Sequence, residues 1–135
     1  MKLQINSNFK KTKKMTETQN SKPYDLEERT FQFAKNVASY VGKLPKNISN
    51  LEYGRQGIGS SGSIGANYTE ANEALSKKDF VMRIKICRKE AKEAAYWLRL
   101  IIETNEEKFK AEGERLFKEA LELKKILSAI LKKSE

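Results

Sequence analysis

The sequence predicts an all-α protein: an up-and-down antiparallel four-helix bundle in residues 24–135, after a basic N-terminal tail in residues 1–23 that is disordered or extended. Three observations support this prediction. The 135 residues include only two prolines and are rich in the helix formers Ala, Leu, Glu and Lys. Four segment starts match a helix-capping pattern, and apolar residues recur between them at spacings of three and four. A chain of this length suffices for one domain with its own core.

Each predicted helix begins with a small polar or acidic residue that is followed three positions later by an acidic one. The four pairs are Asp25 with Glu28, Ser49 with Glu52, Ser76 with Asp79, and Thr104 with Glu107. The first residue of each pair can accept a hydrogen bond from a first-turn N–H, and the second suits the positive end of the helix dipole. With stops at Gly42, Pro45 and Asn105, the pattern predicts helices over about 25–43, 49–75, 77–104 and 106–132.

Three of these helices carry a clear apolar face, as expected for helices packed near antiparallel in a bundle. The predicted core residues are Leu26, Phe33, Ala34, Val37, Ala38, Val41 and Leu44 in the first helix, Phe80, Ile84, Cys87, Ala91, Ala94, Leu98 and Ile101 in the third, and Phe109, Gly113, Leu116, Ala120, Leu123, Leu127 and Ile130 in the fourth. In the third and fourth helices the spacing alternates between four and three along the whole face.

The second helix is unusual because five of the seven glycines fall between Gly54 and Gly65. Gly57, Gly59 and Gly62 match the G-x-G-x-x-G dinucleotide fingerprint, but that motif needs a preceding strand, and the preceding segment begins with a helix cap. We therefore interpret the glycines as part of a helix with two special faces. Leu51, Ile58, Gly62, Gly65 and Thr69, flanked by Gly59 and Ala66, form a small-residue face predicted to pack closely inside the bundle. Gln56, Ser60, Ser63, Asn67 and Glu70 form a polar stripe predicted to lie in a subunit interface or to line a narrow polar channel, with an ordinary solvated face as the alternative.

Two motifs, Ser63-Ile64-Gly65-Ala66-Asn67 and Ser76-Lys77-Lys78-Asp79-Phe80, are the most specific part of a pattern that covers about residues 24–104. The pattern also includes Leu26 to Arg29, Phe31, Phe33, Gln56, Ser60, Glu70, Ala71 and Glu93 through Leu98. In these residues the chain resembles the four-helix bundle proteins encoded in intervening sequences of bacterial 23S ribosomal RNA genes. The sequence departs from the family pattern at Gly57 and Gly59, where relatives often carry a large apolar residue and an arginine.

The resemblance implies a ring-like homopentamer of up-and-down bundles without established enzymatic activity. It also implies a distant relationship to the accessory protein of diversity-generating retroelements, a basic pentamer that binds nucleic acid and a reverse transcriptase. The expected partners are therefore other copies of the chain, RNA or DNA, and a partner protein such as a reverse transcriptase. A purely structural adaptor with no nucleic-acid role is the alternative.

Positive charge marks two candidate nucleic-acid-binding segments. The formal net charge is +9, and residues 1–22 carry six lysines against Glu17. The candidates are Lys10, Lys11, Lys13 and Lys14 in the tail, and Lys78, Lys85, Arg88, Lys89, Lys92 and Arg99 on the third helix. Four of the latter stand seven residues apart, a line of charge that would attract a phosphate backbone. A solvated helix flank, partly neutralised by Glu90 and Glu93, is the alternative.

The sequence offers few candidate residues for catalysis or metal binding. The chain has no histidine, which argues against Glu-x-x-His metal sites and against a His-activated nucleophile. Cys87 falls on an apolar face and is interpreted as a core residue. Tyr96 and Trp97 are interpreted as packing residues, divided between core and interface, with stacking on nucleic-acid bases as the alternative. The carboxylate pairs Glu70 with Glu73 and Glu90 with Glu93 are interpreted as surface groups. We expect no enzyme, metal, cofactor or membrane insertion, and a cytoplasmic location, since a single cysteine cannot form an internal disulfide.

Overall fold

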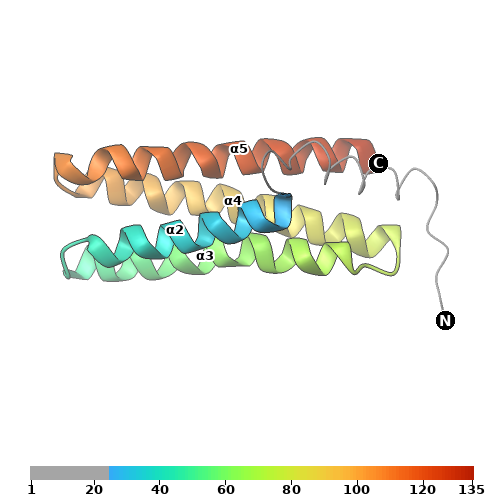
Figure 1. Ribbon diagram of the computed structural model, residues 1–135, viewed down its shortest axis with the longest axis horizontal. Coiled ribbons are helices and arrows are strands. Elements are labelled where there is room, and N and C mark those ends of the chain that lie inside the picture. Colours follow the sequence, from blue (N-terminus) through green and yellow to red (C-terminus); the bar gives the residue numbers. More distant parts are fainter. Residues whose placement is uncertain (1–24) are drawn as a thin grey trace.

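The computed structural model describes residues 25–135, which form four long helices of alternating direction (Figure 1). They are α2 (Leu26–Lys43), α3 (Ile48–Asn72), α4 (Lys77–Thr104) and α5 (Lys110–Ser134), with a short 3₁₀ helix, η1 (Glu107–Phe109), before α5. The predicted all-helical bundle is confirmed, and the described residues contain no strand. Because α2 is the shortest of the four, it begins part-way along the bundle and does not extend along the far end of α3, α4 and α5 (Figure 1).

Two of the four predicted caps are confirmed. The Glu28 N–H donates to Asp25 Oδ1 at 2.9 Å, and the Asp79 N–H donates to Ser76 Oγ at 3.1 Å. Ser49 is not a cap: α3 begins one residue earlier, and Asn47 accepts from the Asn50 N–H instead. Thr104 is the last residue of α4, where its hydroxyl donates to the Leu100 carbonyl.

The chain then turns through Asn105 and η1 before α5 begins at Lys110. The prediction placed this helix start at residue 106 because the pattern did not distinguish the 3₁₀ turn from the first α-helical turn. Similarly, α3 ends at Asn72, three residues before its predicted end.

The predicted cores of α4 and α5 are confirmed, with Phe109 only partly buried. In α2, Leu26, Phe33, Val37 and Leu44 are buried, whereas Val41 and Ala34 are partly exposed and Ala38 is exposed. Tyr40 and Thr30, which were not predicted, complete this face and are both 0% exposed.

The small-residue face predicted for α3 is wrong. Leu51 and Ile58 are 61% and 41% exposed, and Gly59, Gly62, Ala66 and Thr69 also lie on the outside. Within that face, Gly65 does approach α2, where a Cβ would stand 3.0 Å from Thr30 Oγ1. The buried residues of α3 are instead Asn50, Gly54, Gly57, Ser60, Ser61, Ile64, Tyr68 and Ala71.

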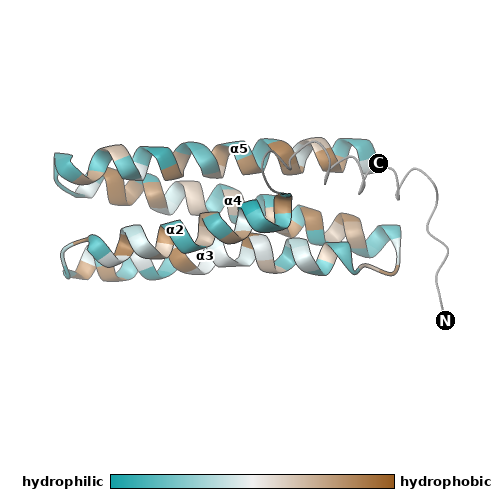
Figure 2. Ribbon diagram, viewed as in Figure 1, coloured by the Kyte–Doolittle hydropathy of each residue, from teal (hydrophilic) through white to brown (hydrophobic). Residues whose placement is uncertain are grey.

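The rotation of α3 follows from where its few large side chains stand. The observed rotation buries Ile64 and Tyr68, which are 0% and 2% exposed and whose apolar surface favours burial, and it leaves Leu51 and Ile58 of the predicted face outside. The glycines on the buried face then receive side chains from neighbours: Trp97 packs over Gly57, and a Cβ on Gly54 would stand 2.5 Å from Val41 Cγ1. Figure 2 shows the middle of α3 as pale ribbon of intermediate hydropathy, which explains why its pattern misled the prediction.

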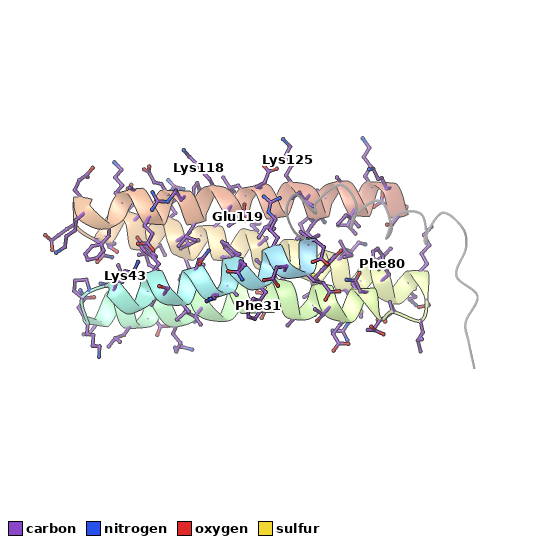
Figure 3. The ribbon with its side chains drawn as sticks, in the orientation of Figure 1. Phe31, Lys43, Phe80, Lys118, Glu119 and Lys125 are labelled. Carbon is purple, nitrogen blue, oxygen red and sulfur yellow. The ribbon has the colours of Figure 1, made fainter. Side chains whose placement is uncertain are left out.

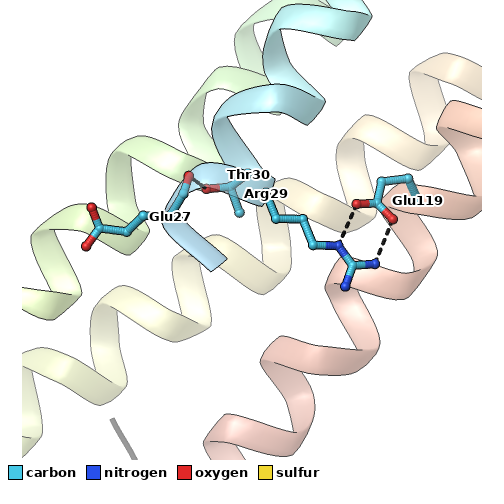
Figure 4. Close-up of polar contacts among 4 residues, drawn as sticks. All are labelled: Glu27, Arg29, Thr30 and Glu119. Atoms are coloured by element: carbon cyan, nitrogen blue, oxygen red, sulfur yellow. Dashed lines mark hydrogen bonds and ion pairs between the residues drawn. The ribbon is translucent and has the colours of Figure 1, made fainter. Parts of the chain in front are cut away.

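Polar contacts tie α2 to α5, which otherwise make few close contacts. Arg29 and Glu119 form a two-pronged ion pair with both N–O distances at 2.8 Å (Figure 4). Near the other end of α2, the buried Tyr40 hydroxyl donates to the Phe109 carbonyl at 2.9 Å. Burial, followed by the charge of Glu112, raises the pKa of Tyr40 to about 12, so the hydroxyl stays protonated and available as a donor.

An amide pair closes the same end of the bundle. Asn50 Nδ2 donates to Asn105 Oδ1 at 2.9 Å, and Asn105 Nδ2 donates back to Asn50 Oδ1 at 2.8 Å. The same groups also donate to the carbonyls of Pro45 and Ile101. These hydrogen bonds join the start of α3 to the end of α4, and they give the polar atoms of the buried Asn50 amide hydrogen-bond partners.

Gly113 is the position at which we expect the fold to tolerate least change. A Cβ there would meet the Tyr40 hydroxyl and stand 2.7 Å from Ile102 Cγ1. We expect Gly113→Ala to lower the free energy of unfolding by about 1 to 3 kcal/mol through overpacking. The measurement is the urea midpoint at a fixed protein concentration.

The matched control is Gly42→Ala, also in a helix but with no described atom within 4 Å of the Cβ position. This change should leave stability equal or raise it by up to about 1 kcal/mol, because alanine is the better helix former. Equal effects of the two substitutions would contradict the packing assigned to Gly113.

Candidate nucleic-acid interface

Helix α4 presents its basic residues to solvent because its opposite face is buried. The buried side chains recur at spacings of four and three from Phe80 to Ile101. On the opposite side of the helix, a row of exposed side chains recurs with the same spacing, two positions before each buried residue. This row consists of Lys78, Met82, Lys85, Lys89, Lys92, Tyr96, Arg99 and Glu103. We call Lys78, Lys85, Lys89, Lys92 and Arg99 the basic stripe. Arg88, the sixth predicted residue of this helix, lies beside the stripe and is half-buried.

The net positive charge of the described chain is concentrated on this helix. Residues 76–105 contain eight basic and four acidic residues, whereas residues 25–75 and 106–135 together contain equal numbers of basic and acidic residues. Within residues 25–135, no cation of the basic stripe forms an ion pair. Arg83, which lies off the stripe, is held by Asp79 at 4.0 Å and by Asn67 Oδ1 at 3.1 Å. The stripe cations are therefore available for an external anion.

Two carboxylates, Glu90 and Glu93, lie near the basic stripe on α4. Partial burial, and next the negative charge of Glu93, raises the pKa of Glu90. Glu90 therefore takes up a proton at a higher pH than an ordinary glutamate, and α4 becomes more positive as the pH falls.

The tail lysines Lys10, Lys11, Lys13 and Lys14 lie outside the described residues, so their role stays a prediction.

The two adjacent aromatic residues of α4 have different environments. Trp97 is partly buried between α4 and α3, stacked on Tyr53 with ring centroids 6.1 Å apart and planes 28° apart. Tyr96 is 58% exposed and meets Trp97 edge to face at 5.1 Å and 80°. Trp97 is therefore a packing residue, as predicted, and the packing of Tyr96 in an interface stays a prediction. Tyr96 lies between Lys92 and Arg99 at the spacing of the basic stripe.

The polar stripe of α3 is largely occupied within the chain. Ser60 is 7% exposed and donates to the Gly57 carbonyl, while Asn67 bonds both Arg83 and the Ser63 carbonyl. Gln56 and Ser63 are half-buried, and Glu70 is exposed. Asn67 thus joins this stripe to α4 of the same chain, and the predicted burial of the stripe between subunits stays a prediction.

The glycine fingerprint has no phosphate-binding geometry, because Gly57, Gly59 and Gly62 lie inside one continuous helix. In the described part of the chain, no group of three His, Cys, Asp or Glu side chains is placed to hold a metal ion. No helix of that part is long and apolar enough to cross a membrane.

The comparisons with known proteins agree with this architecture. Residues 22–129 match the family described as 23S rRNA-intervening sequence protein. The chain belongs to this family. A crystal structure of a protein of unknown function from the S23 ribosomal protein family of Bacteroides thetaiotaomicron is similar, with 29% identity and a TM-score of 0.65. The match covers 78% of this chain and 97% of that chain. No curated protein matches the chain.

Within this family member, Cys87 is a core residue, as predicted. It is 0% exposed, and its Sγ donates to the Ile64 carbonyl at 3.4 Å. Burial raises the pKa of the Cys87 thiol to about 12, so almost no thiolate exists at neutral pH.

We therefore expect iodoacetamide at pH 8 to modify Cys87 at least a hundredfold more slowly in the native protein than in urea. The measurement is mass spectrometry of timed samples, and because the chain has one cysteine no competing site exists. Fast modification of the native protein would contradict the burial described above.

Proposed function

We propose that this family member is a non-enzymatic homo-oligomer that binds RNA or DNA through the basic stripe of α4. The observation that supports nucleic-acid binding is the concentration along one helix face of exposed cations that form no ion pair within residues 25–135. Lys78 and Arg99 stand 21 residues apart, about 32 Å along the helix axis, long enough to follow several phosphates. Contacts to phosphates carry no sequence information, so we propose binding with little sequence preference.

The proposed oligomerisation is supported by apolar residues on the outer face of α2 and α3. Phe31, Ile48, Leu51 and Ile58 are between 41% and 88% exposed. Ile48, Leu51 and Ile58 line one hollow of about 750 Å³, and Phe31 lines another with Gly62 and Ala66. Exposed apolar residues that gather in this way are typical of protein interfaces.

Two glycines on this face also support an interface with another helix. Apart from neighbouring residues and backbone of α3 itself, no described atom lies within 4 Å of the Cβ position of Gly59 or Gly62. Each costs about 0.8 to 1 kcal/mol in a helix relative to alanine, and nothing within the subunit explains that cost. Close approach of another helix would explain it, and we propose a second copy of the chain. A ring of five is the number that the family resemblance implies, and five basic stripes would strengthen binding through avidity.

The proposed nucleic-acid binding is tested by reversing the charge of two residues of the basic stripe. We expect Lys85→Glu with Lys92→Glu to weaken binding of a labelled 23S rRNA fragment by about tenfold or more at low salt. The slope of log K against log salt should fall by about two, since two phosphate contacts are lost. Fluorescence anisotropy across a salt series measures both quantities.

The matched control is Lys118→Glu with Lys125→Glu, which changes the net charge equally. Figure 3 shows both side chains pointing away from the bundle on α5. The control should retain most of the affinity. Equal losses in both variants would indicate a non-specific charge effect, and no binding by the native chain at low salt would favour the adaptor alternative, in which the partner is a protein such as a reverse transcriptase.

The oligomeric half is tested by placing charge on the apolar face. We expect Leu51→Lys with Ile58→Lys to raise the concentration needed for assembly more than tenfold, because each buried side chain contributes about 1.5 to 3 kcal/mol. Light scattering after size exclusion measures the mass. Leu121→Lys, on the 42% exposed Leu121 of α5, is the control and should assemble normally. A monomeric native protein would contradict this half.

A further inference from the structure

The exposed face of α4 contains one aromatic residue among its cations. Tyr96 follows Lys92 by four residues and precedes Arg99 by three, so the three side chains occupy successive turns of one helix face. Lys92 and Arg99 are about 10 Å apart along the axis, with the tyrosine ring between them. Scattered exposed aromatics are ordinary, so position alone would carry little.

The ring is held in place by contacts that begin in the core. Trp97 packs over Gly57, where the Cβ position is 3.5 Å from Trp97 Cβ, and it stacks on Tyr53. Tyr96 then rests edge to face on Trp97, with 58% of its surface open to solvent. A ring supported from one side loses less conformational freedom when a ligand covers it, which favours binding.

The flanking cations and the ring supply the two parts of a single-strand binding surface. Proteins that bind single-stranded nucleic acid combine cations that follow the backbone with aromatic rings on which bases stack. Lys92 and Arg99 form no ion pair within the described residues, and the Tyr96 hydroxyl has no hydrogen bond there. In a duplex the faces of the bases are covered by their neighbours, so a ring on a helix surface could not reach them.

We propose that Tyr96 is a stacking platform for an unpaired base of single-stranded RNA or DNA, with Lys92 and Arg99 contacting the phosphates on either side. This inference rests on the proposed nucleic-acid function and specifies the form of nucleic acid that it binds. A duplex would be held by the basic stripe alone and would not use the ring. The protein therefore binds single strands more tightly than duplexes of the same sequence.

The test compares Tyr96→Ala with Tyr96→Phe in the full chain, using a labelled 20-nucleotide single-stranded RNA and the matching blunt duplex. Tyr96→Ala should weaken single-strand binding by about 5- to 100-fold and duplex binding by less than twofold. Tyr96→Phe retains the ring and should bind both forms within about threefold of the native protein. Because Tyr96→Ala removes no charge, the salt slope should not change.

A second readout comes from Trp97, which is the only tryptophan of the chain and touches Tyr96. Single-stranded RNA should alter its fluorescence in the native protein and in Tyr96→Phe, and much less in Tyr96→Ala. Circular dichroism melting serves as the folding control, since the substitution is on the surface.

The outcomes separate this inference from the function on which it rests. Binding that is equal in the native protein and Tyr96→Ala, or equal for single strand and duplex, would overturn the stacking platform and leave the basic stripe intact. No binding of either nucleic acid by the native protein would overturn both. Loss of capture of a protein partner in Tyr96→Ala, with RNA binding unchanged, would likewise overturn the stacking role.

Discussion

Helix α4 packs against both α3 and α5, and its face from Phe80 to Ile101 is fully buried between them. This burial fixes the rotation of the helix about its own axis. Since a helix repeats every 3.6 residues, a buried row at spacings of four and three leaves a second row with the same spacing facing solvent. The basic stripe occupies that second row, so the packing of the core sets the direction of the cations.

The same packing explains part of the glycine content of α3. Val41 of α2 needs room at Gly54, where a Cβ would stand 2.5 Å from Val41 Cγ1, whereas a Cβ at Gly57 would make an ordinary contact with Trp97 of α4 at 3.5 Å. Trp97 in turn supports the exposed ring of Tyr96. Core packing and surface chemistry are thus connected through one tryptophan.

The outer glycines of α3 have a different explanation. Gly59 and Gly62 face away from the core and have no described neighbour, whereas Gly65 lies against Thr30 of α2. One sequence run therefore serves packing within the subunit on one side and, in our proposal, packing between subunits on the other. In our proposal the basic stripe of α4 binds nucleic acid and the two apolar hollows beside Phe31 and Leu51 serve assembly, so the two proposed functions use different helices.

The sequence by itself determined the fold class, the caps at Asp25 and Ser76, and the buried faces of α4 and α5, because strong apolar periodicity leaves only one favourable orientation. It also placed the charge of α4, since that follows from the same periodicity. Only the tertiary structure decided the rotation of α3, where glycine and serine give several faces nearly equal hydropathy. Which face is buried then depends on the side chains that α2 and α4 bring, such as Val41 and Trp97, and on the burial of Ile64 and Tyr68. The exposure of Tyr96 was decided in the same way, because two adjacent aromatic residues cannot both fit against α3 and only their neighbours determine which one does.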